Sequence, residues 1–397
     1  MSLDDFRQDT RKWLATHCPE SMRTAIPEGE LVWGASHVEF VNDDQKAWFN
    51  AMRDKGWFCP DWPTEYGGGG LDPAQQKVLE QELKAINARP PQINLGIWML
   101  GPVLLEYGTE AQKQRFLPPM ARGEVRWCQG FSEPNAGSDL ASIRTFAEDK
   151  GDHYEINGSK IWTSYGDKSD MMYGVFRTDK QVKHAGISLF VLDMKSPGIT
   201  VRPIDLIAGK SAFCEVFFDK VKVPKDNLIG AVNQGWELAK KLLQHERISM
   251  SKFGEFTLPN HFSLLPAIRE YMATRKANLD ASLPQQAFAA MMDEHAFNLT
   301  AQRMKDEMIA KQSNPGLMSI MKLVHTEQEK HKFELLLDLL GYQALGQSGA
   351  PFSEPQLALT KGWLTSFTTT IAGGSSEIQL NLIAKRVLQL PDAKSGG

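Results

Sequence analysis

The sequence is poor in cysteine and lacks any long apolar run, and each shortage excludes a class of protein. Its four cysteines stand far apart, with no Cys-x-x-Cys pair and no histidine cluster beside them, so neither a zinc site nor a disulfide framework is expected. No apolar stretch approaches the ~18 residues that a membrane span needs. The acidic start Met-Ser-Leu-Asp-Asp is unlike a signal peptide. We therefore expect a metal-free protein of the reducing cytoplasm with no membrane span.

The sequence also lacks a large excess of either acidic or basic residues. The net charge of the 397 residues is only −4, and neither sign forms long blocks, so there is no electrostatic basis for binding nucleic acid or an anionic membrane surface. A content of 42% apolar and 23% charged residues is typical of a globular protein long enough for two or three domains.

The spacing of apolar residues changes twice along the chain. Spacings of three and four predict an N-terminal α-helical domain over residues 1–125, with a capping box at Thr109 and Gln112. Alternating and short apolar runs bounded by turns then predict a small antiparallel β-barrel over residues 126–230. Helical spacing returns after Asn233, a candidate N-cap, and predicts a C-terminal α-helical bundle over 231–392 with a disordered tail at 393–397. The predicted fold class is α+β in three successive domains.

The stretch Trp127–Ser142 is the strongest candidate for a binding loop. Its apolar start breaks at Pro134, and Gly137 is expected to permit a backbone geometry that a side chain would forbid. The loop would then be ordered, with hydroxyls and amides free to face the edge of a flat heterocycle or the phosphates of a nucleotide. The residues expected to do so are Ser132, Glu133, Ser138 and Asp139. An ordinary turn is the alternative.

Four segments of the sequence resemble motifs of the acyl-CoA dehydrogenase family. Ser132–Asp139 is similar to the flavin-contacting motif Thr-Glu-Pro-x-Ala-Gly-Ser-Asp, with Ser for Thr, and Asn157–Ser164 resembles the second flavin strand. Glu215–Gly230 resembles the end of the barrel, and Ile371–Gln379 resembles a C-terminal flavin contact. The resemblance implies a helical domain, a β-barrel and a helical bundle, with FAD as cofactor, an acyl-CoA as substrate and an electron-transfer flavoprotein as electron acceptor. It also implies a place in fatty acid or side-chain β-oxidation.

The resemblance assigns roles to individual residues. Those implied to contact the flavin are Gln129, Phe131, Ser132, Trp162 stacked near the ring, Ser164 at a polar edge, Ser375 and Glu377. Ser138 would contact the pantetheine or phosphate part of CoA. From the residues alone, a core position is the alternative for Trp162, since aromatic side chains dominate core burial.

Glu246 is the candidate catalytic base. It falls on an apolar helical stripe made by Trp236, Ala239, Leu243 and Met250. A carboxylate there either pairs with a cation such as Arg247 or stays desolvated with a raised pKa, and ion pairs are the common outcome on helices.

The family resemblance favours the second outcome, in which Glu246 is a desolvated carboxylate that acts as the catalytic base. Most family members carry the catalytic Glu in a C-terminal Tyr-Glu-Gly-Thr segment, where this sequence has Gly373. A minority, including isovaleryl-CoA dehydrogenase, places it in a Glu-Arg pair on the helix after the barrel, which Glu246-Arg247 matches. By the same resemblance, Arg247 would contact the CoA portion, and the amide of Gly373 would hydrogen-bond the thioester carbonyl. A helix-initiating turn is the alternative for Gly373, and the two interpretations are compatible.

The resemblance weakens at the adenine end of the cofactor. The family's Arg-x-x-Phe-Gly segment is absent between residues 255 and 300, where only Arg275-Lys-Ala-Asn278 is found, and Asp338 replaces a family Gln. The sequence resembles the branch that includes pimeloyl-CoA and steroid side-chain dehydrogenases, which implies a homodimer, a homotetramer or a heterotetramer with a related chain. Small Ala372 and Gly373 would leave room for a branched, ring-bearing or ω-functional acyl group.

Three functions remain open at this point. The first is FAD-dependent α,β-dehydrogenation of an acyl-CoA to the 2-enoyl-CoA. The second is a non-catalytic or partner-dependent subunit of a heteromeric acyl-CoA dehydrogenase. The third keeps the flavin but changes the chemistry to desulfination or oxygen-dependent oxidation.

Overall fold

The computed structural model describes residues 2–27, 29–253, 263–274, 280–310 and 316–391. The chain divides into two compact units, one made of residues 1–204 with 211–259 and the other of residues 205–210 with 260–397. The tail predicted to be disordered, at 393–397, and the segment around Arg275 lie outside the described residues.

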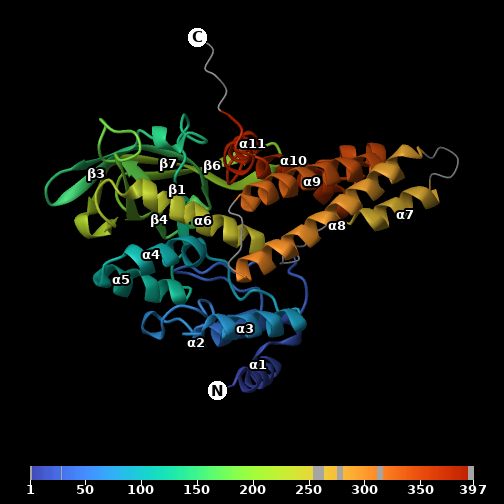
Figure 1. Ribbon diagram of the computed structural model, residues 1–397, viewed down its shortest axis with the longest axis horizontal. Helices are drawn as coiled ribbons and strands as arrows, with labels where there is room; N and C mark the ends of the chain where they lie inside the picture. The colour runs from blue at the N-terminus through green and yellow to red at the C-terminus, as the bar shows by residue number, and fades with distance from the viewer. Residues whose placement is uncertain (1, 28, 254–262, 275–279, 311–315, 392–397) are drawn as a thin grey trace, which may run out of the picture. The chain divides into compact units, whose positions relative to one another are not determined.

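The first unit begins with the helical region that the sequence predicts (Figure 1). Its helices are α1 (Leu3–His17), α2 (Asp43–Asp54), α3 (Pro73–Ala85), α4 (Gly101–Tyr107) and α5 (Glu110–Ala121). The capping box at the start of α5 is confirmed, because the Thr109 hydroxyl accepts from the Gln112 amide while the Gln112 side chain accepts from the Thr109 amide. A π-helical turn, Gly96–Leu100, leads into α4. Such turns are often found at functional sites.

A sheet follows the helices. Its strands are β1 (Trp127–Gly130), β2 (Phe146–Asp149), β3 (His153–Ser164), β4 (Met171–Arg177), β5 (Ile187–Asp193), β6 (Ile199–Leu206), β7 (Gly209–Pro224) and β8 (Leu228–Ile229). Among the described residues the strand order is β6-β7-β3-β2-β4-β5-β8, with β1 paired to β4. The end strands β6 and β8 are not paired with each other, so closure into a barrel stays a prediction.

The expectation of a purely antiparallel sheet was wrong for two strand pairs. β1 runs parallel to β4, with Trp127 opposite Met171, and β2 meets β4 in a parallel pair at Phe146 and Arg177. The short apolar run expected at Ile187–Leu192 is confirmed in β5, and β4 is likewise buried almost without interruption. Both faces of these strands are covered, which gives a continuous apolar run instead of an alternating one.

Helix α6 (Gly235–Phe253) packs against β4, β5, α4 and the π-helical turn (Figure 1). The prediction that Asn233 caps this helix was wrong. Asn233 has a φ of +69°, and its side-chain oxygen accepts a hydrogen bond from Thr178, 2.6 Å away. The helix begins two residues later, and Asn233 instead ties the preceding turn to the β4–β5 connection.

The second unit is helical. Its helices are α7 (Leu264–Thr274), α8 (Ser282–Ile309), α9 (Leu317–Leu340), α10 (Glu354–Thr369) and α11 (Ser376–Leu382). α9 packs against α7, α8, α10 and α11, and its apolar residues supply much of a buried cluster that includes Leu335, Leu336 and Leu339. This arrangement agrees with the predicted C-terminal bundle.

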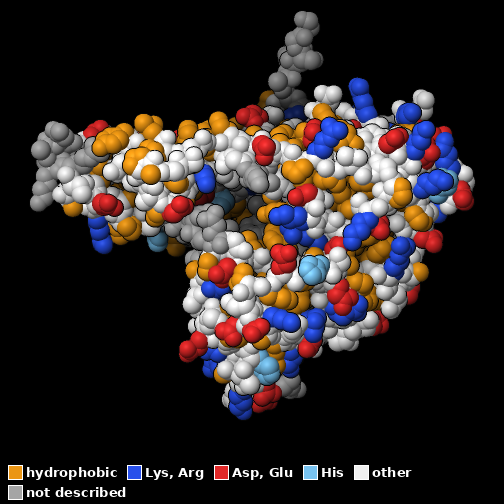
Figure 2. All heavy atoms as spheres, turned by 180° about the vertical axis from the view of Figure 1, so that it is seen from behind, with side chains coloured by type: hydrophobic (Ala, Val, Ile, Leu, Met, Phe, Trp, Pro, Cys, Tyr) orange, Lys and Arg blue, Asp and Glu red, His pale blue; other side chains and the backbone are white. Residues whose placement is uncertain are grey.

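The surface agrees with the absence of charge blocks in the sequence. In Figure 2, acidic and basic side chains are interspersed over the visible face, without a broad area of one sign.

None of the helices in the described part of the chain is long and apolar enough to cross a bilayer.

Candidate active site

A buried ion pair fixes the loop after β1. The Lys160 ammonium, in the middle of β3, donates to Oε1 of Glu133 at 2.8 Å and to the backbone carbonyl of Phe131 at 3.0 Å. Glu133 also accepts from the backbone amides of Arg144 at 2.6 Å and Thr145 at 3.0 Å. The Lys160 side chain is fully buried and that of Glu133 is 8% exposed. The expectation that Glu133 faces a ligand was therefore wrong, because its carboxylate is used internally. The loop is held to the sheet by a network that water does not reach.

Burial and mutual attraction act in opposite directions on the two charges. Burial lowers the pKa of Lys160 to about 8, although Glu133 opposes the change. Burial alone would raise the pKa of Glu133, but the charge and hydrogen bond of Lys160, together with the hydrogen bonds from Arg144 and Thr145, bring the pKa below its ordinary value. Both groups are ionised at neutral pH.

Five of the side chains predicted to contact the flavin come from β1, this anchored loop and β3. The Ser132 carbonyl accepts from the Ile161 amide at 2.9 Å, which brings the loop beside Trp162. Trp162 is 51% exposed and has a φ of +61°, at a place where the pairing of β3 with β7 shifts register. The shift turns the indole out of the core, so the alternative of a core tryptophan was wrong.

Three polar side chains near the loop keep their hydrogen-bonding capacity. Gln129, Ser132 and Ser164 are partly exposed, and in the described part of the chain none of their side-chain groups bonds to another residue. Phe131 is buried, with its ring edge-on to Tyr173 at 6.3 Å between centroids. The loop therefore presents unpaired polar groups from an apolar base.

The expectation for Gly137 was wrong. An added Cβ would meet no atom within 4 Å, and the residue does not adopt a positive φ. The neighbouring Ser138 is exposed, as a contact to a ligand outside the core requires.

Glu246 lies on the face of α6 that packs on the core. Leu238, Ala239 and Leu242, one and two turns before it, are almost fully buried, and Leu243 packs against the same cluster. Glu246 itself is partly buried. The predicted stripe is confirmed at Ala239 and Leu243, whereas the side chains of Met250 and Arg247 lie outside the described set.

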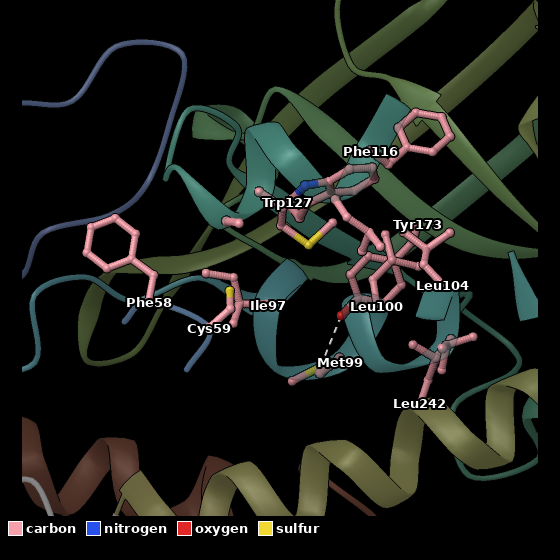
Figure 3. Close-up of a cluster of buried hydrophobic side chains, with 14 of the residues drawn as sticks. Phe58, Cys59, Ile97, Met99, Leu100, Leu104, Phe116, Trp127, Tyr173 and Leu242 are labelled. Carbon is pink, nitrogen blue, oxygen red and sulfur yellow. Dashed lines mark hydrogen bonds between the residues drawn. The ribbon is translucent and has the colours of Figure 1, made fainter. Parts of the chain in front are cut away.

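Tyr173 of β4 lies near this carboxylate. Its hydroxyl donates to the sulfur of Met99 at 3.0 Å, and Leu242 enters the same cluster from α6 (Figure 3). Burial raises the pKa of the Tyr173 phenol well above its usual value, and the charge of Glu246 raises it further. Glu246 therefore stands at the edge of a dry apolar cluster in which a carboxylate charge is weakly screened.

In the second unit, the predicted residues lie together on the turn between α10 and α11. Gly373 and Gly374 have φ values of +67° and +99°, conformations that favour glycine. Ser375 is the N-cap of α11 and accepts from the Ile378 amide at 3.4 Å. Glu377 is exposed in the first turn. The turn expected at the two glycines is confirmed.

Sequence reasoning missed three polar residues that hold these segments: Lys160, Tyr173 and Gln379. Lys160 was detectable, because it lies in phase with the inward-facing Tyr154 and Ile156 of β3. Gln379 is 1% exposed and donates to the carbonyls of Gly373 and Gly374. Tyr173 gave no signal, since an aromatic residue in a strand is ordinary.

Comparison with known sequences covers nearly the whole chain. Residues 4–124, 128–221 and 233–388 match the N-terminal, middle and C-terminal domains of acyl-CoA dehydrogenases. The chain is 33% identical over 396 residues to acyl-CoA dehydrogenase IpdE1 of Mycobacterium tuberculosis, covering 99% of each chain. It is 34% identical over 408 residues to acyl-CoA dehydrogenase IpdE1 of Mycolicibacterium smegmatis, covering 100% of each.

Solved structures agree with the sequence matches. The Tcur3481-Tcur3483 steroid ACAD superposes with a TM-score of 0.74 at 25% identity, covering 98% of each chain. The ChsE4-ChsE5 complex from Mycobacterium tuberculosis superposes with a TM-score of 0.70 at 26% identity, again covering 98% of each. The chain thus has the fold of these enzymes, with helical N- and C-terminal regions around a central sheet, and it belongs to the acyl-CoA dehydrogenase family of oxidoreductases.

Proposed function

We propose that this chain catalyses the FAD-dependent α,β-dehydrogenation of an acyl-CoA thioester to the 2-enoyl-CoA, with Glu246 as the base. The observation that carries the proposal is the place of Glu246, a carboxylate at the margin of the apolar cluster around Tyr173 and Leu242. A general base needs a carboxylate whose environment does not stabilise its charge as well as water does. The partial burial of Glu246 supports this condition.

The residues around the β1 loop suit a flavin. The exposed indole of Trp162 offers a flat apolar surface, and the unpaired groups of Gln129, Ser132 and Ser164 offer donors and acceptors to a heterocycle edge. We assign these residues with Phe131 to the cofactor, and Ser375 and Glu377 to its remaining contacts, following the family resemblance. When bound, the flavin supplies the acceptor for the hydride that leaves the β-carbon.

The chain's own groups act on the thioester. Glu246 removes the α-proton, and the Gly373 amide donates to the carbonyl oxygen on which negative charge develops. One such donor contributes about 3 kcal/mol to transition-state stabilisation. Ser138 and Arg247 are assigned to the CoA portion. An electron-transfer flavoprotein is assigned as the subsequent electron acceptor.

Glu246→Gln tests the base. The substitution keeps the shape and removes the proton acceptor, so kcat should fall by about 10²–10⁴-fold or more while the purified protein stays yellow. Glu237→Gln is the matched control, because Glu237 lies on α6 but is exposed and paired with Lys240. Substantial residual activity in Glu246→Gln, with Glu237→Gln at wild-type rate, would refute the assignment.

A second candidate function is that of a subunit that depends on a partner chain. Two of the similar structures are described as the pairs Tcur3481-Tcur3483 and ChsE4-ChsE5, which supports a heteromeric assembly. If the chain is active alone, the purified protein should be yellow and bleach with an acyl-CoA. A colourless protein that gains flavin only with a second chain supports the partner-dependent function.

The substrate class proposed is a bulky acyl-CoA, ring-bearing or branched. It rests on the small Ala372 and Gly373 and on similarity to a structure described as a steroid ACAD. Flavin bleaching by a panel of linear, branched and ring-bearing acyl-CoAs tests it, and a preference for linear chains would contradict it.

We also propose that the sheet curls toward a barrel and that the domains span 1–125, 126–230 and 231–392. Register shifts between β3 and β7 at Ile156/Gly158 and Lys160/Thr163 support the curvature, since bulges bend a strand. The three matched regions support the boundaries.

A further inference from the structure

The turn Gly373–Ser375 has three consecutive backbone N–H groups without an acceptor in the described part of the chain. The flanking amides differ, because Ala372 donates to Thr368 at 2.9 Å and Ser376 donates to Thr370 at 3.0 Å. Gly373 is exposed, and Gly374 and Ser375 are partly exposed. The turn therefore presents a run of donors between two amides that are used internally.

The carbonyls of the same turn are held by one side chain. Nε2 of Gln379 donates to the Gly373 carbonyl at 3.2 Å and to the Gly374 carbonyl at 3.4 Å. Gln379 is 1% exposed, so these bonds do not compete with water. A Cβ on Gly374 would lie 2.6 Å from Nε2 of Gln379, which shows how closely the side-chain amide packs against the turn.

Because the peptide bond is planar, fixing a carbonyl also fixes the direction of the N–H group of the next residue. In a trans peptide the C=O of one residue and the N–H of the next point in opposite directions. Since the Gly373 and Gly374 carbonyls point at Gln379, the N–H groups of Gly374 and Ser375 point away from it. Two adjacent glycines are the residues that flip a peptide plane most easily, so without this contact the donors would be lost in part of the population.

We propose that Gln379 is a positioning residue, which locks the diglycine turn so that its N–H groups stay directed at the carbonyl oxygen of the bound thioester. This inference rests on the proposed function, which places that oxygen at Gly373, and extends the donor set to Gly374 and Ser375. Gln379 touches neither substrate nor cofactor in this role. Its Oε1 has no partner among the described residues, so within that set only the Nε2 donors of the side chain are used.

Gln379→Met tests this positioning role, because methionine keeps the length of the side chain and removes both N–H donors of Nε2. We expect kcat to fall by about tenfold to 10²-fold with little change in KM. We also expect the infrared carbonyl stretch of a bound, ¹³C-labelled enoyl-CoA to move toward its frequency in water. The control is Asn381→Leu, an exposed position of the same helix, which should leave both readouts unchanged.

A second measurement needs no substitution. Hydrogen exchange of peptides covering residues 370–377 in the wild-type holoenzyme should slow when the enoyl-CoA is added, because the N–H groups gain an acceptor. Unchanged exchange would overturn the proposal, as would a Gln379→Met variant with wild-type kcat and carbonyl stretch. If the wild-type protein oxidises no acyl-CoA, the proposed function fails instead, and the exchange experiment still decides whether the turn binds a thioester.

Discussion

The buried pair Lys160–Glu133 gives the sharpest test of how the cofactor loop is held. Replacing Lys160 by methionine keeps most of the side-chain volume, so little cavity is created and the effect is mainly electrostatic. Glu133 would keep its two backbone donors but lose the ammonium group that is hydrogen-bonded to it, at a position where its side chain is 8% exposed. Removing one partner of a buried pair destabilises a protein by about 3–5 kcal/mol. We expect a loss in this range at pH 7.

A matched control is available a few residues away. Lys150 lies 2.9 Å from Glu148, nearly the separation of the buried pair, but the two side chains are 37% and 51% exposed. Exposed pairs contribute little because water and salt screen them, so Lys150→Met should leave stability unchanged. Equal distances and unequal effects would show that burial, and not separation, decides the strength of the pair.

Urea unfolding followed by circular dichroism measures both variants. Lys160→Met should also lose flavin more readily, because Lys160 holds the Phe131 carbonyl inside the cofactor loop. Adding Glu133→Gln to Lys160→Met should restore part of the stability, since the uncompensated charge is then gone. The reasoning is refuted if Lys160→Met is no less stable than Lys150→Met, or if the double variant is less stable than Lys160→Met.

Two further predictions concern stability. Hydrogen bonding by Arg11, with Arg7 beside it, holds the pKa of Glu82 below its ordinary value. The stability from this group is thus present above the ordinary glutamate pKa of about 4.3 and lost as pH falls through the lower folded value. Glu82→Gln should therefore lower the melting temperature at neutral pH and flatten its fall in acid, and an unchanged acid profile would contradict this. Gly130→Ala should destabilise by about 1–3 kcal/mol, because an added Cβ would collide with the sulfur of the buried Met172. Gly137→Ala, with open space around it, should be neutral or slightly stabilising in the same melts.

The sequence predicted the elements whose signals are local. The capping box at Thr109 and Gln112 involves residues three apart, and the inward phase of Tyr154 and Ile156 follows from the two-residue period of a strand. The apolar stripe on α6 likewise predicts Glu246 on the core-facing side, where the structure has it. Each of these signals lies within one element.

Several of the features that were missed join residues far apart in the chain. Lys160 and Glu133 are 27 residues apart, and the parallel pairing of β1 with β4 brings Gln129 opposite Tyr173. Nothing in a lysine within a strand reveals that a glutamate from another segment will pair with it. The Asn233 cap failed for a related reason, because a tertiary hydrogen bond from Thr178 competes for the same side chain.

The proposed catalytic groups lie on segments whose conformation is held by buried polar side chains of neighbouring strands and helices. Lys160 of β3 holds the loop that carries Ser132, and Gln379 of α11 holds the turn that carries Gly373. Lys160 binds the carbonyl of Phe131, and Gln379 binds those of Gly373 and Gly374. Among the described residues, the Ser132 hydroxyl and the N–H groups of the diglycine turn have no internal partner. Because these side chains are buried, water does not compete for their hydrogen bonds. The polar groups of the two segments therefore stay oriented before a ligand arrives, and binding costs less conformational entropy. Substitutions at Lys160 and Gln379 should therefore alter cofactor retention and turnover, respectively, although neither residue contacts a ligand.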